Sequence, residues 1–132
     1  MQDPTPYGEA MKSKGGLTRL VNALRYTWDG LKAAATHEEA FKQELLVVIP
    51  LSVAAWLIPV DVIQRALLFS VLQLILIVEL INSAIEANTD HISLERHPLA
   101  KRAKDMGSAA VFLTIVIAAS VWGAVLWQRF AA

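Results

Sequence analysis

A run of 19 residues without a charged side chain, residues 109–127, constrains the fold of this chain more than any other feature. A helix rises about 1.5 Å per residue, so such a run crosses the roughly 30 Å hydrocarbon core of a membrane. Two other apolar runs, residues 45–60 and 62–87, precede it. The first of them is short and contains Pro50, so a buried core helix is the alternative there. We predict an all-α membrane protein with three spans, over about residues 45–60, 62–88 and 107–129.

The composition favours a membrane protein and excludes several other classes. Hydrophobic residues make up 55% of the 132 residues, and 12 basic and 12 acidic side chains give a net charge of zero. This balance gives no basis for a nucleic-acid partner. Cysteine is absent, which excludes disulfides, thiolate metal ligands and a cysteine nucleophile. Residues 1–14 lack the apolar segment of a signal peptide, so we expect a polar tail there and one domain over residues 15–132.

A different pattern precedes the first apolar run. Six apolar side chains recur there at helical spacing: Leu17, Leu20, Val21, Leu24, Trp28 and Leu31. Arg19, Arg25 and Lys32 project to other faces of the same helix. The pattern predicts an amphipathic helix over about residues 16–40 that lies in the membrane interface. The alternative is a soluble helix packed on a domain, but the chain offers no other soluble domain for it to cover.

The distribution of basic residues predicts the orientation in the membrane. Six lie before the first apolar run: Lys12, Lys14, Arg19, Arg25, Lys32 and Lys42. Four lie between the second and third runs: Arg96, Lys101, Arg102 and Lys104. The first hairpin has only Arg65, and the end of the chain has only Arg129. By the positive-inside rule, the N-terminus and the second loop are cytoplasmic and the C-terminus is periplasmic.

The second apolar run carries a polar stripe that marks a candidate site. At 100° per residue, five side chains share one face of a helix: Glu79, Asn82, Ser83, Glu86 and Asp90. An ionisable group in hydrocarbon costs at least about 2.5–3.5 kcal/mol, so by default it indicates a functional site. Depth counting from Val62 puts Glu79 just below the cytoplasmic surface and Glu86 roughly 10 Å farther along the axis. The stripe therefore suits chemistry between a lipid and an aqueous ligand.

Acidic side chains on and before the stripe could bind a metal ion. Glu86 with Asp90, and Glu38 or Glu44 upstream, offer the oxygen ligands that Mg²⁺ prefers. The alternative is that these acids form ion pairs at the membrane surface. The basic partners available for such pairs are Lys101, Arg102 and Lys104.

The start of the third apolar run could bind phosphate. Lys104, Asp105 and Ser108 stand where the third helix would enter the membrane. A lysine together with helix-start amides can hold a phosphate group. A lysine cluster at this boundary is more often a topology signal, so both interpretations stay open.

Self-association is expected, because three helices alone give a thin core. Small residues recur along the third run: Gly107, Ser108, Ala109, Ala110, Ala118, Ala119 and Gly123. Such residues let membrane helices approach closely. In a single three-helix subunit, polar side chains would face lipid at a high cost. We therefore predict a homo-oligomer.

Two strings of the sequence resemble the small prokaryotic integral-membrane diacylglycerol kinases. They are ELINSAIEANTD (residues 79–90) and AKDMGSAAV (residues 103–111), and YTWDGLKAAA (26–35) with EAFKQE (39–44) fits the proteobacterial form. The resemblance covers about residues 15–130. It implies three membrane helices and a surface helix per subunit, a homotrimer with composite sites between subunits, and the bacterial inner membrane.

The resemblance also implies roles for individual residues. Glu79 is the expected general base for the lipid hydroxyl, and Glu38 and Glu86 are the expected Mg²⁺ ligands. The implied ATP contacts are Arg19, Tyr26, Glu38, Glu86, Glu95, His97, Lys104 and Asp105. Trp28 and Ser108 are expected, with Glu79, beside the lipid substrate, and Asn82, Asp90 and Glu44 are expected to support the site. Phosphoryl transfer by positioning and charge neutralisation agrees with this set of residues.

Two alternatives to a diacylglycerol kinase remain at this point. An undecaprenol kinase would share these motifs and differ in its lipid. A small proton-coupled transporter could also use a lone membrane glutamate. The transporter would need the acid near the membrane midplane and would leave Lys104 and Asp105 without a role.

Overall fold

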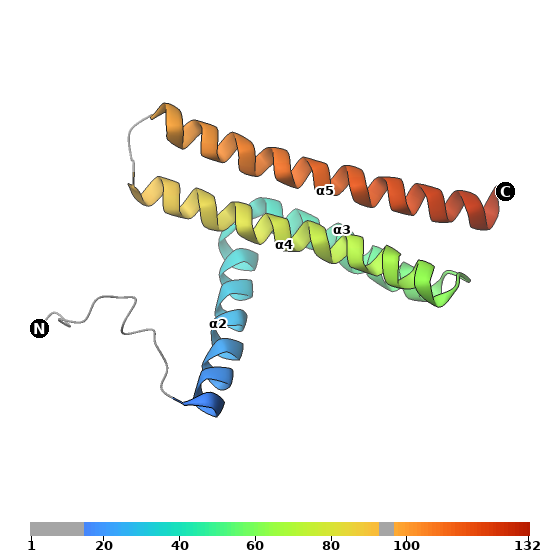
Figure 1. The fold of residues 1–132 in the computed structure, drawn as a ribbon, viewed down its shortest axis with the longest axis horizontal. Helices are drawn as coiled ribbons and strands as arrows, with labels where there is room; N and C mark the ends of the chain where they lie inside the picture. Colours follow the sequence, from blue (N-terminus) through green and yellow to red (C-terminus); the bar gives the residue numbers. More distant parts are fainter. Residues whose placement is uncertain (1–14, 93–96) are drawn as a thin grey trace, which may run out of the picture. The chain divides into compact units, whose positions relative to one another are not determined.

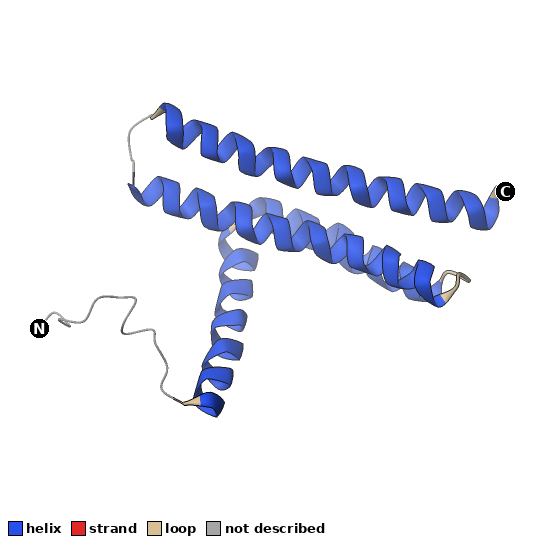
Figure 2. Cartoon of the chain, viewed as in Figure 1, coloured by secondary structure: helices blue, strands red, loops and turns tan. Residues whose placement is uncertain are grey.

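The protein is all-helical over the residues that its structure, a computed structural model, describes, which are 15–92 and 97–132. Four helices follow one another, as Figures 1 and 2 show: α2 (Gly16–His37), α3 (Glu39–Leu57), α4 (Val62–Ile92) and α5 (Pro98–Phe130). No strand occurs in these ranges, which confirms the predicted all-α class. The predicted tail, residues 1–14, and the candidate residue Glu95 lie outside the described residues.

Three of the helices are long and apolar enough to cross a membrane, as predicted: α3, α4 and α5. The chain divides into two parts, one that ends at Ala33 and one that comprises Ala34–Ala132, and each is described by itself. The first part holds most of α2, so a helix exists where an amphipathic one was expected. The position of α2 in a membrane interface stays a prediction.

Helix α3 differs from the predicted first span at both ends. It begins at Glu39, not near residue 45, because the polar segment EAFKQE, which precedes the apolar run in the sequence, is also helical. It runs through Pro50 without a break, although proline removes one backbone donor from a helix. It ends at Leu57, not near residue 60, because Ile58 precedes a proline and adopts an extended conformation (φ −67°, ψ 134°).

Helix α4 starts with an aspartate cap. The Asp61 carboxylate accepts hydrogen bonds from the backbone N–H groups of Ile63 (2.8 Å) and Gln64 (2.9 Å). These donors have no partner inside a helix, so the cap stabilises the turn from α3 into α4. A short turn of this kind places α3 and α4 beside each other as a hairpin.

The core of the second part lies along α4, which packs against both α3 and α5 (Figure 1). One cluster joins Ala55, Leu68 and Val125, and another joins Val71, Ile75 and Ala118. The ring of Trp122 packs against both clusters, and its Nε1 donates to the carbonyl of Leu68 at 3.2 Å. Many large apolar side chains outside these clusters are exposed, among them Leu46, Ile63, Phe112 and Leu113. Such a surface suits contact with lipid.

Candidate active site

The polar stripe of α4 is buried at one end and exposed at the other. Glu79, Asn82 and Ser83 are 4%, 7% and 9% exposed, whereas Glu86 is half-buried and Asp90 is exposed. The shared face that the sequence predicts is therefore present. However, its buried members pack inside the helical unit and do not face lipid. The burial of these three side chains within one chain does not by itself require a second subunit, and the expected homo-oligomer stays a prediction.

Four carboxylates, two on α4, one on α3 and one on the residue that precedes α3, form what we call the acidic cluster: Glu38, Glu44, Glu79 and Glu86. Glu79 lies close enough to Glu86 and Glu38 for these carboxylates to repel one another. Glu44 lies close enough to Glu79 for the same effect. Glu38 takes its place because the chain is extended there, between α2 and the first turn of α3 (φ −101°, ψ 108°).

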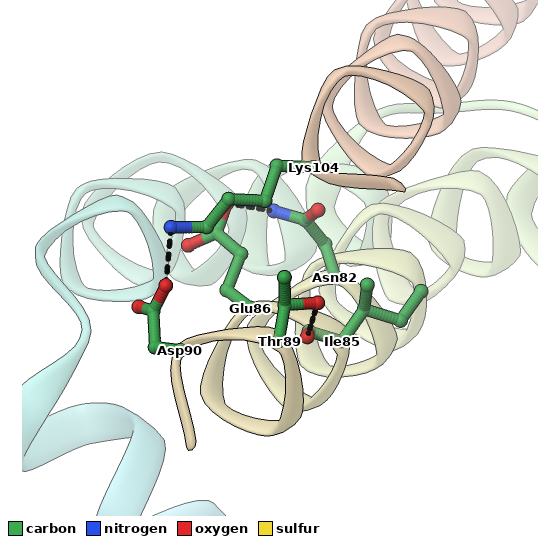
Figure 3. A network of polar contacts seen from close by, with 6 residues as sticks. All are labelled: Asn82, Ile85, Glu86, Thr89, Asp90 and Lys104. Carbon is green, nitrogen blue, oxygen red and sulfur yellow. Dashed lines mark hydrogen bonds and ion pairs between the residues drawn. The ribbon is translucent and has the colours of Figure 1, made fainter. Parts of the chain in front are cut away.

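Compensation of charge inside the acidic cluster is poor. Among the described residues, no basic side chain forms an ion pair with any of its four members. The Oε2 atom of Glu44 is buried and has no hydrogen-bond partner in the described part of the chain. Within the described residues, Glu86 has one hydrogen-bond partner, because Nδ2 of Asn82 donates to its Oε1 at 3.2 Å (Figure 3). Like charges held together in this way are a feature of sites that bind cations or move protons.

Lys104 brings a positive charge from α5 to the edge of the acidic cluster. Its Nζ lies 2.6 Å from Oδ1 of Asp90, and Figure 3 shows the side chain reaching from α5 toward the end of α4. Glu86 is also near enough to attract it. Lys104 and Asp90 are both partly exposed to solvent. The predicted proximity of Lys104 to the acids is thus present in a single chain.

The alternative of simple ion pairing holds for one acid of the stripe, because Asp90 pairs with Lys104. Outside the stripe, Asp105 pairs with Lys101 one turn earlier on α5, with 2.5 Å between Nζ and Oδ2. It does not hold for Glu79 or Glu86, which form no ion pair within the described ranges.

Two candidate residues at or on α5, His97 and Ser108, are not members of the acidic cluster. His97 caps α5, because its Nδ1 accepts a hydrogen bond from the backbone N–H of Leu99 at 3.2 Å. Ser108 is exposed on α5. Arg19, Tyr26 and Trp28 belong to α2, which is described by itself, so their roles stay predictions.

One contact of the stripe was not expected from the sequence. Gly107 of α5 lies directly against the side chain of Asn82, whereas the sequence suggested only that small residues on this helix ease packing. The pairing depends on the register between α4 and α5, which no local pattern reveals. The available signal in the sequence is that Gly107 follows the predicted phosphate-binding residue Lys104 by three positions.

Comparison with known proteins places the chain in a family. The family model of prokaryotic diacylglycerol kinase matches residues 25–126, which include the acidic cluster and Lys104. A relative from Escherichia coli, named "Diacylglycerol kinase", is 49% identical over 87% of this chain and 94% of its own length. Relatives with the same name from Pseudomonas aeruginosa (46%, over 93% and 97%) and Haemophilus influenzae (40%, over 85% and 95%) agree. The chain belongs to the prokaryotic diacylglycerol kinase family.

Proposed function

We propose that this protein transfers the γ-phosphate of ATP to the primary hydroxyl of diacylglycerol, which gives phosphatidic acid and ADP. The relatives named diacylglycerol kinase support the reaction. The observation in the structure that carries the proposal is the acidic cluster with Lys104 at its edge. Apolar helices lead up to it, so a lipid and a water-soluble nucleotide can both approach the same place.

Glu79 is the proposed general base. It is the most buried carboxylate of the stripe, and no described residue donates a hydrogen bond to it. Its oxygens therefore have lone pairs available for the proton of a lipid hydroxyl. Removing that proton as the oxygen attacks the γ-phosphate is the step that a positioned base accelerates.

Glu38 and Glu86 are the proposed ligands of Mg²⁺. No group of three or more histidine, aspartate or glutamate side chains is spaced to bind a metal among residues 15–92 and 97–132. A site of one or two carboxylates fits Mg²⁺, which usually takes further ligands from substrate phosphates and water. When bound, the ion would neutralise charge on the phosphates.

Lys104 is the proposed phosphate-binding cation. Its ammonium group pairs with Asp90 at the edge of the acidic cluster, where it can also approach a bound triphosphate. Asn82, Asp90 and Glu44 support the site through their contacts on α4 and α3. By family resemblance we also propose nucleotide contacts at Arg19, Tyr26, Glu95, His97 and Asp105, and lipid contacts at Trp28 and Ser108.

The proposed assembly is a homotrimer in the bacterial inner membrane. The N-terminus and the acidic cluster would lie on the cytoplasmic side, where ATP is available, and the C-terminus would be periplasmic. Basic residues before α3, together with Arg96 and the three basic residues in the first two turns of α5, support this orientation.

Phosphoryl transfer in mixed micelles tests the proposal. Purified protein is incubated with γ-labelled ATP, Mg²⁺ and either diacylglycerol, undecaprenol or no lipid. We expect label in phosphatidic acid, far less in undecaprenyl phosphate, and none without lipid. Faster transfer to undecaprenol than to diacylglycerol would make undecaprenol the acceptor. Transfer to neither lipid would overturn the proposed function. Proton-driven solute flux in liposomes without ATP would favour a transporter instead.

A further inference from the structure

The contact between α4 and α5 at Gly107 assigns a role to this glycine. We propose that Gly107 is a positioning residue, because the absence of a side chain there leaves room for the Asn82 amide in the orientation that donates to Glu86. The inference rests on the proposed role of Glu86 at the nucleotide. It extends that role to a residue on a different helix, which itself touches no reacting group.

Space at Gly107 is the first observation. Gly107 is buried, and a Cβ atom there would overlap Oδ1 of Asn82 and lie 3.2 Å from its Cγ. The other helical glycines of the described residues differ, because a Cβ at Gly16, Gly30 or Gly123 would meet nothing within 4 Å. Gly107 is thus the helical glycine at which a side chain and a neighbour compete for the same volume.

The polarity of the amide is the second observation. A carboxylate can only accept hydrogen bonds, so Glu86 must face the NH₂ group of Asn82 and not its oxygen. Nδ2 does donate to Oε1 of Glu86 at 3.2 Å, and Oδ1 then points toward Gly107. Oδ1 is buried there and has no hydrogen-bond partner within residues 15–92 and 97–132. The volume at Gly107 is therefore what accommodates the oxygen, since no donor holds it.

A methyl group at position 107 should disturb the amide and not the helices. The overlap involves the tip of the Asn82 side chain, whose terminal torsion is soft. Rotation about that torsion moves Oδ1 out of the overlap, and a displacement of a few tenths of an ångström relieves the remaining 3.2 Å contact with Cγ, so α4 and α5 can keep their packing. The same rotation removes Nδ2 from Glu86, and the Glu86 carboxylate loses its hydrogen bond to Asn82.

Nuclear magnetic resonance of the side-chain amides tests this directly. The chain has three asparagines, Asn22, Asn82 and Asn88, so the Asn82 amide pair can be assigned by its loss in Asn82→Ala. In ¹⁵N-labelled protein without nucleotide, we expect Glu86→Gln and Gly107→Ala each to shift this pair. Gly123→Ala is the matched control on the same helix and should leave it unmoved.

Kinetics with the same variants measures the consequence. We expect kcat/KM for ATP to fall about tenfold in Gly107→Ala, the factor that loss of one hydrogen bond to a charged group amounts to. A rise in the Mg²⁺ concentration needed for half-maximal rate should accompany it. Gly123→Ala should stay within about twofold of the unaltered protein. In an Asn82→Ala background, adding Gly107→Ala should change kcat/KM by less than about twofold, because the group that it displaces is gone.

Three outcomes would overturn the positioning role. The first is an unmoved Asn82 resonance in Gly107→Ala. The second is that Gly107→Ala lowers kcat/KM equally in the unaltered protein and in Asn82→Ala. The third is a Gly107→Ala protein that fails to fold while Gly123→Ala folds, which would make the contact a matter of helix packing. Absence of kinase activity in the unaltered protein would instead overturn the proposed function, and the resonance comparison would still decide the contact.

Discussion

Polar side chains gather at two places on the α3–α5 unit, and their contacts differ in kind. We call the second place the hairpin end; it comprises the turn at residues 58–61 with Gln64, Arg65 and Arg129. There, Nη2 of Arg65 donates to the carbonyls of Ile58 (3.2 Å) and Val60 (3.5 Å). At the acidic cluster, by contrast, carboxylates face one another without an ion pair among the described residues.

Further bonds at the hairpin end tie α5 to the turn. Nε of Arg129 donates to the carbonyl of Pro59 at 2.6 Å, and Gln64 donates to Gln128 at 3.0 Å. Backbone carbonyls left open by a tight turn need donors in or near hydrocarbon, so these contacts serve stability.

This difference in contacts distinguishes polar side chains that stabilise the fold from polar side chains that serve the reaction. Repelling carboxylates destabilise a fold unless something positive binds them, whereas arginines on carbonyls stabilise it. The acidic cluster therefore makes sense as a place that receives a cation and a proton during a reaction. Substitutions at the acidic cluster should change activity more than stability, and those at the hairpin end should do the reverse.

Glu79→Gln should have the largest effect of all. It keeps the shape of the side chain but removes the base, so turnover should fall on the order of 10²–10⁴-fold. It also removes one of the repelling charges, so the thermal midpoint in detergent should stay equal or rise. Glu39→Gln is the matched control, since Glu39 is exposed and pairs with Lys42 at the start of α3. Near-normal turnover by Glu79→Gln would remove the base assignment.

Lys104→Ala should have the second-largest effect on activity. Loss of a charge-assisted bond to phosphate should raise KM for ATP at least about tenfold, with a smaller change in KM for the lipid. Arg102→Ala is the control, because Arg102 is an exposed basic residue of the same part of α5 and has no proposed contact with substrate. The measurement is initial rate against ATP concentration at saturating lipid. Equal changes in both Michaelis constants would argue that Lys104 acts on the fold.

Arg129→Ala tests the expectation that substitutions at the hairpin end lower stability and leave turnover unchanged. Its bond to Pro59 is worth about 1 kcal/mol, which corresponds to a fall of a few degrees in the thermal midpoint. Turnover at a temperature where the protein stays folded should be unchanged. Arg102→Ala removes an exposed arginine from the opposite end of α5 and should leave the midpoint where it is. A turnover loss in folded Arg129→Ala would break the division between the two ends.

Periodicity and hydropathy predicted much of this arrangement. The uncharged run at residues 109–127 and the two runs before it correctly indicated three spans. The 100° spacing of Glu79, Asn82 and Ser83 correctly put them on one face, because helix geometry alone determines it. The start of α3 was misplaced, since hydropathy marks where hydrocarbon begins and not where hydrogen bonding along a helix begins.

Contacts between helices could not be predicted from the sequence, and the reason is physical. The neighbours of Lys104 and Gly107 depend on how α5 slides along α4, and many side chains far from either residue determine that register. The bond from Arg129 to Pro59 spans 70 positions of the chain and has no local signature. Family resemblance supplied roles for Glu79 and Lys104, but it supplied no contact.

Asp90→Asn should have the smallest effect and sharpens the boundary of the acidic cluster. Its pair with Lys104 is partly exposed, so the midpoint should move by no more than about 2 °C, and by less at high salt. Asp90 also competes with phosphate for the same ammonium group. We therefore expect KM for ATP to stay within about threefold of the unaltered protein, in contrast to Lys104→Ala. Titration of both variants with ATP at low and high salt makes the comparison. A loss as large as that of Lys104→Ala would show that Asp90 is needed to hold the lysine at the nucleotide, and the acidic cluster would then extend to the end of α4.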